Sequence, residues 1–278
     1  MNTPFLLPEH HPLALNSWRV WAVPLAALLG ALLIATPERN AQVFLALNHL
    51  AAGGLEAPWE WLTALGDALT ALCIVLMLAR LRPGLVLSAI LAALLSTLLI
   101  NGLKDLLDVP RPPAVLGEAV NVVGDALRKG AFPSGHTATA FTLVGVLAAY
   151  VRSARLLAGL VLLATLVGFS RIAVGVHWPL DVCGGAFLGW TSGLAGVYLA
   201  RRWGWEGRPR VLGGVHLLLL GCALVLLLGH DSGYPQADLL EKGVALAALA
   251  IHLALRPGAG LPGAQAGRLP QAAKSGSA

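Results

Sequence analysis

The chain has 278 residues, of which 57% are hydrophobic and only 12% are charged, and its formal net charge is +5. A soluble domain has about twice that share of charged residues, so the composition excludes an ordinary soluble fold and predicts an all-α bundle of transmembrane helices. The excess of Lys and Arg does not indicate a nucleic-acid partner. These residues lie mainly in short segments between apolar blocks, where they set membrane orientation.

Eight apolar blocks are each close to the ~20 residues that a helix needs to cross a bilayer. Polar faces at helical period are nearly absent from them, as expected for helices surrounded by lipid and by one another. The first block is interpreted as a retained span and not as a signal peptide, because residues 1–17 contain no Lys or Arg. The predicted spans cover residues 18–36, 62–80, 84–103, 134–151, 155–173, 179–200, 211–229 and 237–255.

The spans divide the chain into four parts. Residues 1–17 form a short lead, and residues 18–200 form a core of six spans. Residues 201–255 add two further spans whose role the sequence leaves open. Residues 256–278 are rich in Gly, Ala and Gln without periodicity, which predicts a disordered tail. With a cytoplasmic N-terminus, the inner loops carry more Lys and Arg than the outer ones, so both termini are expected in the cytoplasm.

Several features outside the main motifs receive simple interpretations. Residues 39–61 are expected to form a short helix on the outer membrane interface. Asp67, just inside the second span, is interpreted as a solvated residue at the membrane rim in preference to a partner of a basic cluster. The polar residues in or near the last outer loop are expected to be solvated; they are His230, Asp231, Asp238 and Glu241. The cysteines lie inside spans, which predicts no disulfide framework and no thiolate metal site; they are Cys73, Cys183 and Cys222.

The first cluster of charge at a span end follows the third span. Lys104 lies at the end of that helix, because Pro110 and Pro112 prevent it from continuing, and Arg111 lies between the prolines on a stiff extended segment. Two cations on rigid backbone suit a phosphate, with Arg offering a fork of donors and Lys a point charge. This end faces outside, where positive charge is not expected as a topology signal.

The second cluster, Pro133-Ser134-Gly135-His136, opens the fourth span. Ser134 suits the N-cap position, and Gly135 lets the backbone come close to a ligand. Free N–H groups at the helix start, together with the helix dipole, favour a bound anion. His136 lies on the first turn of this helix, where it can act as a proton donor.

The third cluster joins the fifth and sixth spans. Arg171 closes the fifth, and His177 and Asp181 are four residues apart, so they share a face once helix begins near Pro179. A carboxylate one turn from a histidine can fix the ring tautomer and support an imidazolium. Charge between two apolar runs is costly and usually functional.

The sixth span also carries small residues at regular spacing. Gly185, Gly189 and Gly193 recur every four residues. Such a stripe lets another helix approach closely in a membrane, so we expect this span to pack inside the bundle.

Traced through the spans, all three clusters fall on the outer face of the membrane. They lack the paired acidic ligands typical of a divalent metal, so we expect neither a metal nor a cofactor. The cations and helix N–H groups suit phosphate-ester cleavage, because they can hold the phosphoryl oxygens and stabilise transition-state charge. In this chemistry His177, oriented by Asp181, attacks phosphorus to form a phosphohistidine. His136 then protonates the leaving oxygen and activates the water that hydrolyses the intermediate.

Together the motifs resemble the three-part signature of the type-2 phosphatidic acid phosphatase superfamily, over about residues 104–181. They read Lys104-x6-Arg111-Pro112, Pro133-Ser134-Gly135-His136 and Ser170-Arg171-x5-His177-x3-Asp181. The resemblance implies a metal-independent phosphatase with a six-span core over residues 18–200, from which the last two spans depart. It implies His177 as nucleophile, His136 as acid and base, and Asp181 as orienter. The implied phosphate-binding residues are Lys104, Arg111, Ser134, Gly135 and Arg171.

The resemblance also implies a lipid phosphate substrate and a site on the outer, periplasmic side of a bacterial inner membrane. Undecaprenyl diphosphate is favoured on family prevalence, while phosphatidylglycerophosphate, phosphatidic acid and the 1-phosphate of lipid A are compatible. Transfer of the phosphoryl group to a lipid acceptor would use the same residues. An anion transporter would place charges at mid-span, and is therefore disfavoured. No obligate protein partner is inferred.

Overall fold

The computed structural model describes residues 17–54, 56–79, 82–204 and 208–255, and within these ranges its regular structure is entirely helical. The lead expected before residue 17 and the tail expected over 256–278 lie outside the described residues. The helices are α1 (Trp18–Leu33), α2 (Pro37–Ala51), α3 (Glu56–Ala64), α4 (Ala68–Leu78), α5 (Pro83–Leu107), α6 (Pro112–Leu116), the 3-10 turn η1 (Gly117–Ala119), α7 (Gly135–Ala148), α8 (Ala154–Ala173), α9 (Pro179–Trp203), α10 (Pro209–Leu228) and α11 (Asp238–Ala254).

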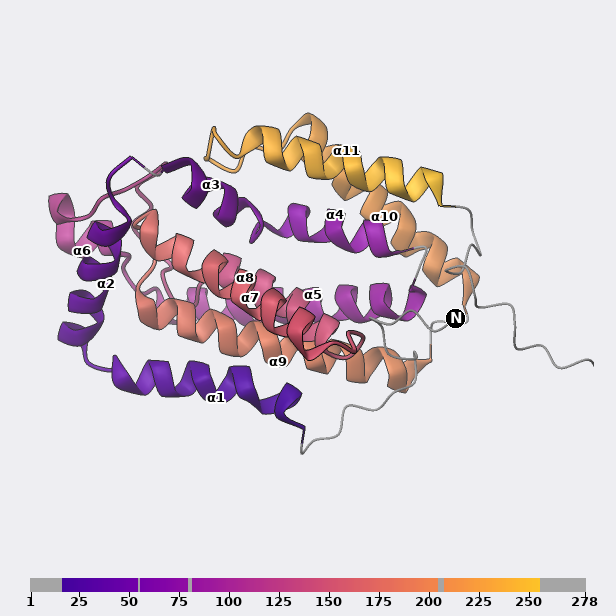
Figure 1. Cartoon of the computed structure of the whole chain (residues 1–278), viewed down its shortest axis with the longest axis horizontal. Helices are drawn as coiled ribbons and strands as arrows, with labels where there is room; N and C mark the ends of the chain where they lie inside the picture. The colour runs from indigo at the N-terminus through magenta and orange to yellow at the C-terminus, as the bar shows by residue number, and fades with distance from the viewer. Residues whose placement is uncertain (1–16, 55, 80–81, 205–207, 256–278) are drawn as a thin grey trace, which may run out of the picture.

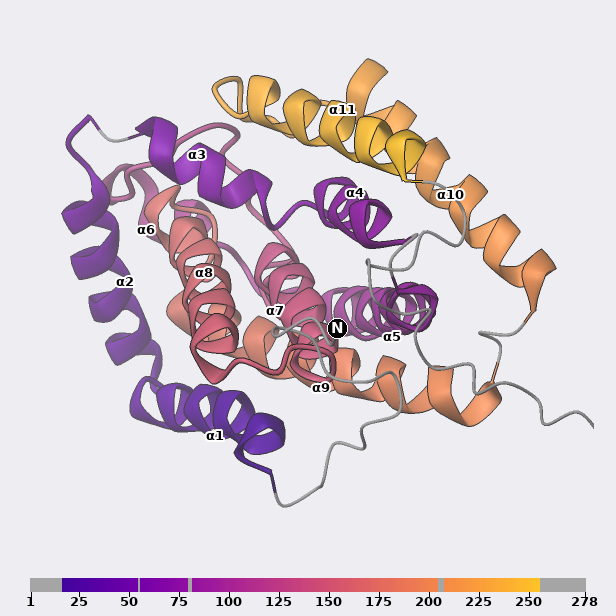
Figure 2. The ribbon, with the colours of Figure 1, turned by 45° about the vertical axis from the view of Figure 1, so that its right-hand side comes forward.

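The long helices run side by side, with α7 at the centre of the bundle (Figure 1). Helix α7 contacts α5, α8 and α9, and α1 packs on the outer side of α9. The C-terminal pair, α10 and α11, packs on α4, which lies between that pair and the α5–α7 core (Figure 2). Helices α2, α3 and α6 gather with the α10–α11 turn at one end of the bundle, on the left in Figure 1.

The glycine stripe of α9 faces α7, as the sequence predicted for a closely packed helix. A Cβ atom on Gly185 would lie 2.5 Å from the carbonyl oxygen of Ser134, and one on Gly193 would lie 2.6 Å from that of Thr142. Gly189 is likewise seated against the main chain of Ala138. The two backbones therefore meet along three successive turns, and this contact fixes the start of α7 relative to the start of α9.

Each predicted span contains a helix, and the span predicted over 62–80 is bent. Helices α3 and α4 meet there at a bend of 59°. At the bend a Cβ atom on Gly66 would lie 2.9 Å from the carbonyl oxygen of His136, so this site takes only glycine without displacement. Asp67 then caps α4 by accepting hydrogen bonds from the N–H groups of Leu69 (2.8 Å) and Thr70 (3.1 Å). Its role is a helix cap, which the interpretation as a solvated rim residue did not include.

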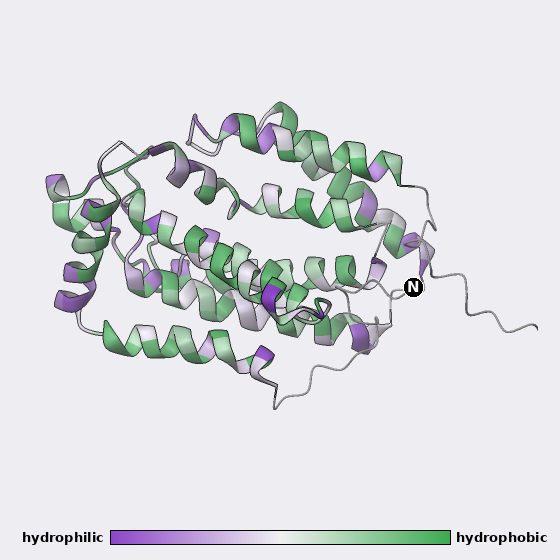
Figure 3. Ribbon diagram, in the orientation of Figure 1, coloured by the Kyte–Doolittle hydropathy of each residue, from purple (hydrophilic) through white to green (hydrophobic). Residues whose placement is uncertain are grey.

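Hydropathy identifies a multi-pass membrane protein. Four helical segments of the described chain are long and apolar enough to cross a bilayer: Pro83–Ala119, Ala154–Ala173, Pro179–Trp203 and Pro209–Leu228. The number rises to six if each bent pair is one span, α1 with α2 (107°) and α3 with α4 (59°). Apolar residues make up most of the helical ribbon, whereas polar residues concentrate toward the two ends of the bundle (Figure 3). Many large apolar side chains are exposed, among them Leu32, Leu98 and Leu217.

The contact between α7 and α9 generates the first prediction. Gly189→Ala forces a methyl group into the main chain of Ala138, and overpacking of this kind typically costs about 1–3 kcal/mol. We therefore expect a lower midpoint of thermal unfolding for the detergent-purified protein. The matched control is Gly221→Ala on α10, where nothing lies within 4 Å of the added atom. Equal midpoints for the two variants would contradict the packing described above.

Candidate active site

The ends of four helices meet at the same end of the bundle. The last turns of α5 and α8 and the first turns of α7 and α9 converge there (Figure 1). The topology therefore brings the three sequence clusters, which are separated by up to 77 positions between Lys104 and Asp181, into one region. Each predicted site residue lies in it.

The imidazole of His177 is bound on one side by the carboxylate of Asp181. Its Nδ1 lies 3.2 Å from Asp181 Oδ2, and both side chains are buried. The same oxygen accepts a hydrogen bond from the N–H of Trp178 at 2.8 Å, which caps α9. Because a carboxylate accepts and does not donate, Nδ1 carries the proton and Nε2 is left with its lone pair. The pair thus presents an unprotonated ring nitrogen away from Asp181.

Burial in the bundle and the nearby cations act on this ring in the same direction. Burial first, then the charges of Arg111, Arg171 and Lys104, hold the pKa of His177 well below its usual range. A neutral imidazole is the form in which Nε2 can attack an electrophile. The environment therefore favours the neutral form of the His177 imidazole.

Arg111 is held rigidly beside the free face of His177. Its Nε donates to the carbonyl of Lys129 (2.7 Å), Nη2 donates to that of Gly130 (3.3 Å), and Nη1 donates to that of Val176 (3.1 Å). The same Nη1 lies 3.4 Å from His177 Nε2. An anion bound by this guanidinium would therefore lie next to His177 Nε2.

An indole bond ties the first and third motifs together. Trp178 Nε1 donates to the carbonyl of Pro110 at 2.9 Å, so the residue after His177 is fixed to the residue before Arg111. The Trp178 side chain thereby fixes the main chain beside His177 to the main chain beside Arg111.

The start of α7 supplies the second motif. The N–H of Ser134 donates to the carbonyl of Asp181 at 3.0 Å, joining the starts of α7 and α9. Ser134 occupies the N-cap position as predicted, but its hydroxyl does not cap the helix and instead accepts from Thr137 Oγ1 at 2.9 Å. The side chain of Lys104 reaches over the helix start, since a Cβ on Gly135 would lie 3.8 Å from its Nζ. His136 follows on the first turn, with its main chain against Gly66.

Arg171 completes the cluster of cations, and here the structure adds a residue that sequence reasoning missed. Arg171 is only 2% exposed, and its Nη1 donates to the hydroxyl of Tyr234 at 3.0 Å. Tyr234 lies in the turn between α10 and α11, outside the three motifs. The sequence offered no spacing signal for this contact, because it joins residues 63 positions apart through a loop.

The expectation that the last outer loop is solvated was wrong in part. Glu241 is only 2% exposed, and His230 Nε2 lies 3.4 Å from Asp67 Oδ2. Asp231 is exposed as predicted, and Asp238 is partly exposed and forms an ion pair with Lys242 at 2.6 Å. The turn between α10 and α11 is therefore folded onto the bundle.

The described residues contain no group of three or more His, Cys, Asp or Glu side chains placed to hold one metal ion. The site is instead built from three cations, two histidines and one carboxylate, all on helix ends and short connections. Such a set can bind and stabilise a phosphoryl group through Lys, Arg and main-chain N–H donors.

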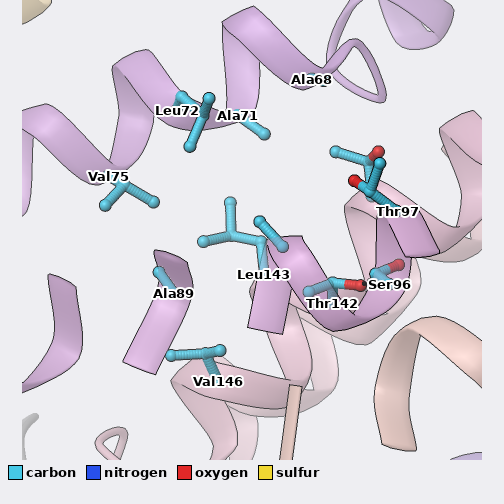
Figure 4. A pocket seen from close by; sticks show the side chains of 12 residues that line it. Ala68, Ala71, Leu72, Val75, Ala89, Ser96, Thr97, Thr142, Leu143 and Val146 are labelled. Atoms are coloured by element: carbon cyan, nitrogen blue, oxygen red, sulfur yellow. Dashed lines mark hydrogen bonds between the residues drawn. The ribbon is translucent and has the colours of Figure 1, made fainter. Parts of the chain in front are cut away.

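A largely apolar cavity of about 120 Å³ lies near the site, between α4 on one side and α5 and α7 on the other (Figure 4). Its lining includes Thr139, one helical turn beyond His136. From there it continues past Leu143 and Val146 on α7, opposite Leu72 and Val75 on α4. The cavity therefore begins about one helical turn beyond His136 and extends into the apolar part of the bundle.

Comparison with known proteins gives a family match. A model described as the PAP2 superfamily matches residues 85–205. The putative undecaprenyl-diphosphatase YbjG of Escherichia coli strain K12 is 39% identical over 66 residues, which is 23% of this chain and 32% of that protein. Among solved structures, Aquifex aeolicus LpxE is 35% identical with a TM-score of 0.53, and the match covers 56% of this chain and 93% of that one.

A transmembrane PAP2-type phosphatidylglycerolphosphate phosphatase from Bacillus subtilis also matches, with 23% identity and a TM-score of 0.47 over 69% of this chain and 99% of that one. The chain belongs to the PAP2 superfamily, because it covers nearly all of LpxE at 35% identity and carries the family match over residues 85–205. This confirms the resemblance of the motifs and the all-α transmembrane fold class. The family and these relatives indicate a phosphatase. Helices α10 and α11 lie beyond the matched interval.

The second prediction concerns the Asp181 carboxylate. Asp181→Asn retains an oxygen that can accept the Trp178 N–H, so the start of α9 should persist, but it removes the charge that supports the imidazole. We expect the rate of phosphate release to fall by about 10²-fold or more, with little change in the midpoint of thermal unfolding. The control is Asp108→Asn, which alters an exposed carboxylate at the end of α5. A wild-type rate for Asp181→Asn would contradict the assigned orientation.

Proposed function

We propose that this protein hydrolyses a phosphate or diphosphate monoester of a membrane lipid through a phosphohistidine on His177. The observation that carries the proposal is the geometry of that ring, with Nδ1 bound to Asp181 at 3.2 Å and Nε2 beside Arg111 at 3.4 Å. A phosphate held by Arg111, Arg171 and Lys104 would lie within reach of Nε2. The nucleophile and the groups that bind the anion are then parts of one rigid site.

In the first step His177 Nε2 attacks phosphorus in line, the P–N bond forms and the bond to the leaving oxygen breaks. His136 donates a proton to that oxygen as it leaves. In the second step His136 takes a proton from water, the water oxygen attacks phosphorus, and the P–N bond breaks to release phosphate and restore His177. The cations, with Ser134, Gly135 and the N–H groups at the start of α7, stabilise the charge on the phosphoryl oxygens in both steps.

A lipid substrate is supported by the cavity between α4, α5 and α7. It begins one turn from His136, the proposed proton donor to the leaving group, and it is lined mainly by apolar side chains. In this arrangement the phosphate occupies the polar end of the bundle while the hydrocarbon chain of the leaving group lies at membrane depth.

Undecaprenyl diphosphate is the substrate we favour. Support comes from the relative named as a putative undecaprenyl-diphosphatase, although the match spans about a third of that protein. The terminal phosphate would be transferred to His177, with the lipid monophosphate as leaving group. We place the site on the periplasmic side of a bacterial inner membrane with both termini in the cytoplasm, on the distribution of Lys and Arg between the loops.

The third prediction tests the nucleophile. His177→Ala should lower phosphate release by about 10³-fold or more while leaving membrane insertion and thermal unfolding unchanged, because a small apolar residue replaces a ring whose contacts lie at the site. The assay uses detergent-purified protein, with lipid phosphates of different head groups compared side by side. His49→Ala is the matched control, since that histidine contacts the carbonyl of Ala119 outside the site. Turnover at the wild-type rate by the His177 variant would remove the mechanism.

The fourth prediction tests the lipid cavity. Ala93 lines it on α5, so Ala93→Phe should reduce kcat/KM for a long-chain lipid phosphate by about tenfold through lost space for the chain. A short, soluble phosphate monoester should be hydrolysed at an unchanged rate. Ala26→Phe, on the exposed side of α1, controls for the added ring. Equal losses with both substrates would exclude this cavity as the lipid site.

Phosphotransfer to a lipid hydroxyl remains the second candidate, since the phosphohistidine could pass its group to an alcohol in place of water. The two reactions differ in products. A radiolabelled terminal phosphate would appear as free phosphate in hydrolysis and in a second lipid in transfer, and the same purified protein serves for both measurements.

A further inference from the structure

Arg171, the proposed phosphate-binding arginine at the end of α8, contacts Tyr234, which lies beyond the family match over residues 85–205. Arg171 Nη1 donates to the Tyr234 hydroxyl at 3.0 Å, and the guanidinium carbon lies 5.5 Å from the centroid of the Tyr234 ring. Both side chains are buried. We propose that Tyr234 is a positioning residue that sets Arg171 for phosphate binding, and that the α10–α11 pair is thereby a working part of the site.

The state of the Arg171 side chain supports this role. Its Nε is buried and has no hydrogen-bond partner among the residues that the structure describes. An unsatisfied donor of a buried cation is costly, so it is most simply explained by a bound anion that completes it. Tyr234 holds Nη1, which leaves Nε and the remaining donors of the guanidinium for phosphoryl oxygens.

Tyr234 can serve as a fixed support because its loop is anchored to α3. The N–H of Gln236 donates to Glu60 Oε2 at 2.9 Å, and Trp61 Nε1 donates to the carbonyl of Gln236 at 2.9 Å. Two hydrogen bonds in opposite directions between the same segments fix the loop along α3. The tyrosine is therefore not carried on a freely moving turn.

The ring of Tyr234 is also packed into the walls of the site. It belongs to a small apolar cluster with Val123, Val174 and Val176, and the last of these immediately precedes the nucleophile. Gly124 lies in the loop between η1 and α7, and a Cβ on it would lie 3.1 Å from the ring. This loop therefore packs tightly against Tyr234. The ring of Tyr234 therefore makes apolar contacts, whereas its hydroxyl accepts the hydrogen bond from Arg171.

This inference deepens the proposed function and rests on it for the identity of the substrate phosphate. It states that the last two helices contribute to anion affinity rather than only to anchoring in the membrane. Loss of the Tyr234 hydroxyl should therefore weaken binding of any phosphate-like anion. The chemical step at His177 should be affected much less, since among the described residues Tyr234 forms no hydrogen bond with His177 or His136.

The test uses Tyr234→Phe in the full-length, detergent-purified protein, which keeps the packed ring and removes only the hydroxyl. We expect KM for the lipid phosphate and the inhibition constant of orthovanadate each to rise about tenfold, with kcat within about threefold of wild type. The matched control is Tyr198→Phe on α9, whose side chain is 68% exposed. A second readout is the rise in the unfolding midpoint on adding orthovanadate, which needs no turnover.

A double-mutant cycle separates action through Arg171 from a general effect on the fold. In an Arg171→Ala background, Tyr234→Phe should change the vanadate-induced shift no further. An equally large loss in that background, or an unchanged KM and vanadate affinity in the single variant, would overturn the inference. If the wild-type protein binds orthovanadate but releases no phosphate from any lipid tested, the proposed function fails while the role of Tyr234 is still decided by the binding measurement.

Discussion

The carboxylate and main chain of Asp181 make the contacts on which the whole site depends. One carboxylate oxygen accepts from His177 Nδ1 and from the Trp178 N–H, and the carbonyl accepts from the Ser134 N–H. A single residue thus orients the His177 imidazole, caps the start of α9 and joins it to the start of α7. These bonds are buried, where an unmet donor or acceptor is costly, so the arrangement has little freedom to vary. The glycine stripe of α9 supports this arrangement by bringing the backbones of α7 and α9 into contact further along the two helices.

The electrostatics of the site are dominated by a cluster of positively charged side chains. Lys104, Arg111 and Arg171 gather around one small volume with Asp181 as the carboxylate among them. Concentrated positive charge at partly buried positions is unfavourable in the absence of an anion, and a phosphoryl group relieves it. The same field lowers the proton affinity of His177. In the proposed mechanism, the cations that bind the substrate phosphate therefore also keep the attacking imidazole neutral.

Much of the fold and of the site could be predicted from the sequence. The length of each apolar block identifies a membrane span, and the position of a residue at the end of a span indicates its level in the membrane. Assigning opposite directions to successive spans was enough to predict that the three clusters lie on one face of the membrane. The i to i+4 spacing of His177 and Asp181 indicated their contact. The bend at Gly66 was not predictable, since it depends on the close approach of His136 from another helix. The contact of Tyr234 with Arg171 was equally hidden. Loop contacts between distant segments leave no periodic signal, and for this reason the role of α10 and α11 emerged only from the structure.

The most direct measurement is to locate the phosphoryl group during turnover. The purified protein is mixed with a lipid diphosphate that carries a radiolabelled terminal phosphate, quenched within milliseconds, and digested for peptide mapping. The account predicts an acid-labile, alkali-stable label on His177 that forms before free phosphate is released and decays as it appears. Label on any other residue, or phosphate release without a labelled protein at any time point, would contradict it.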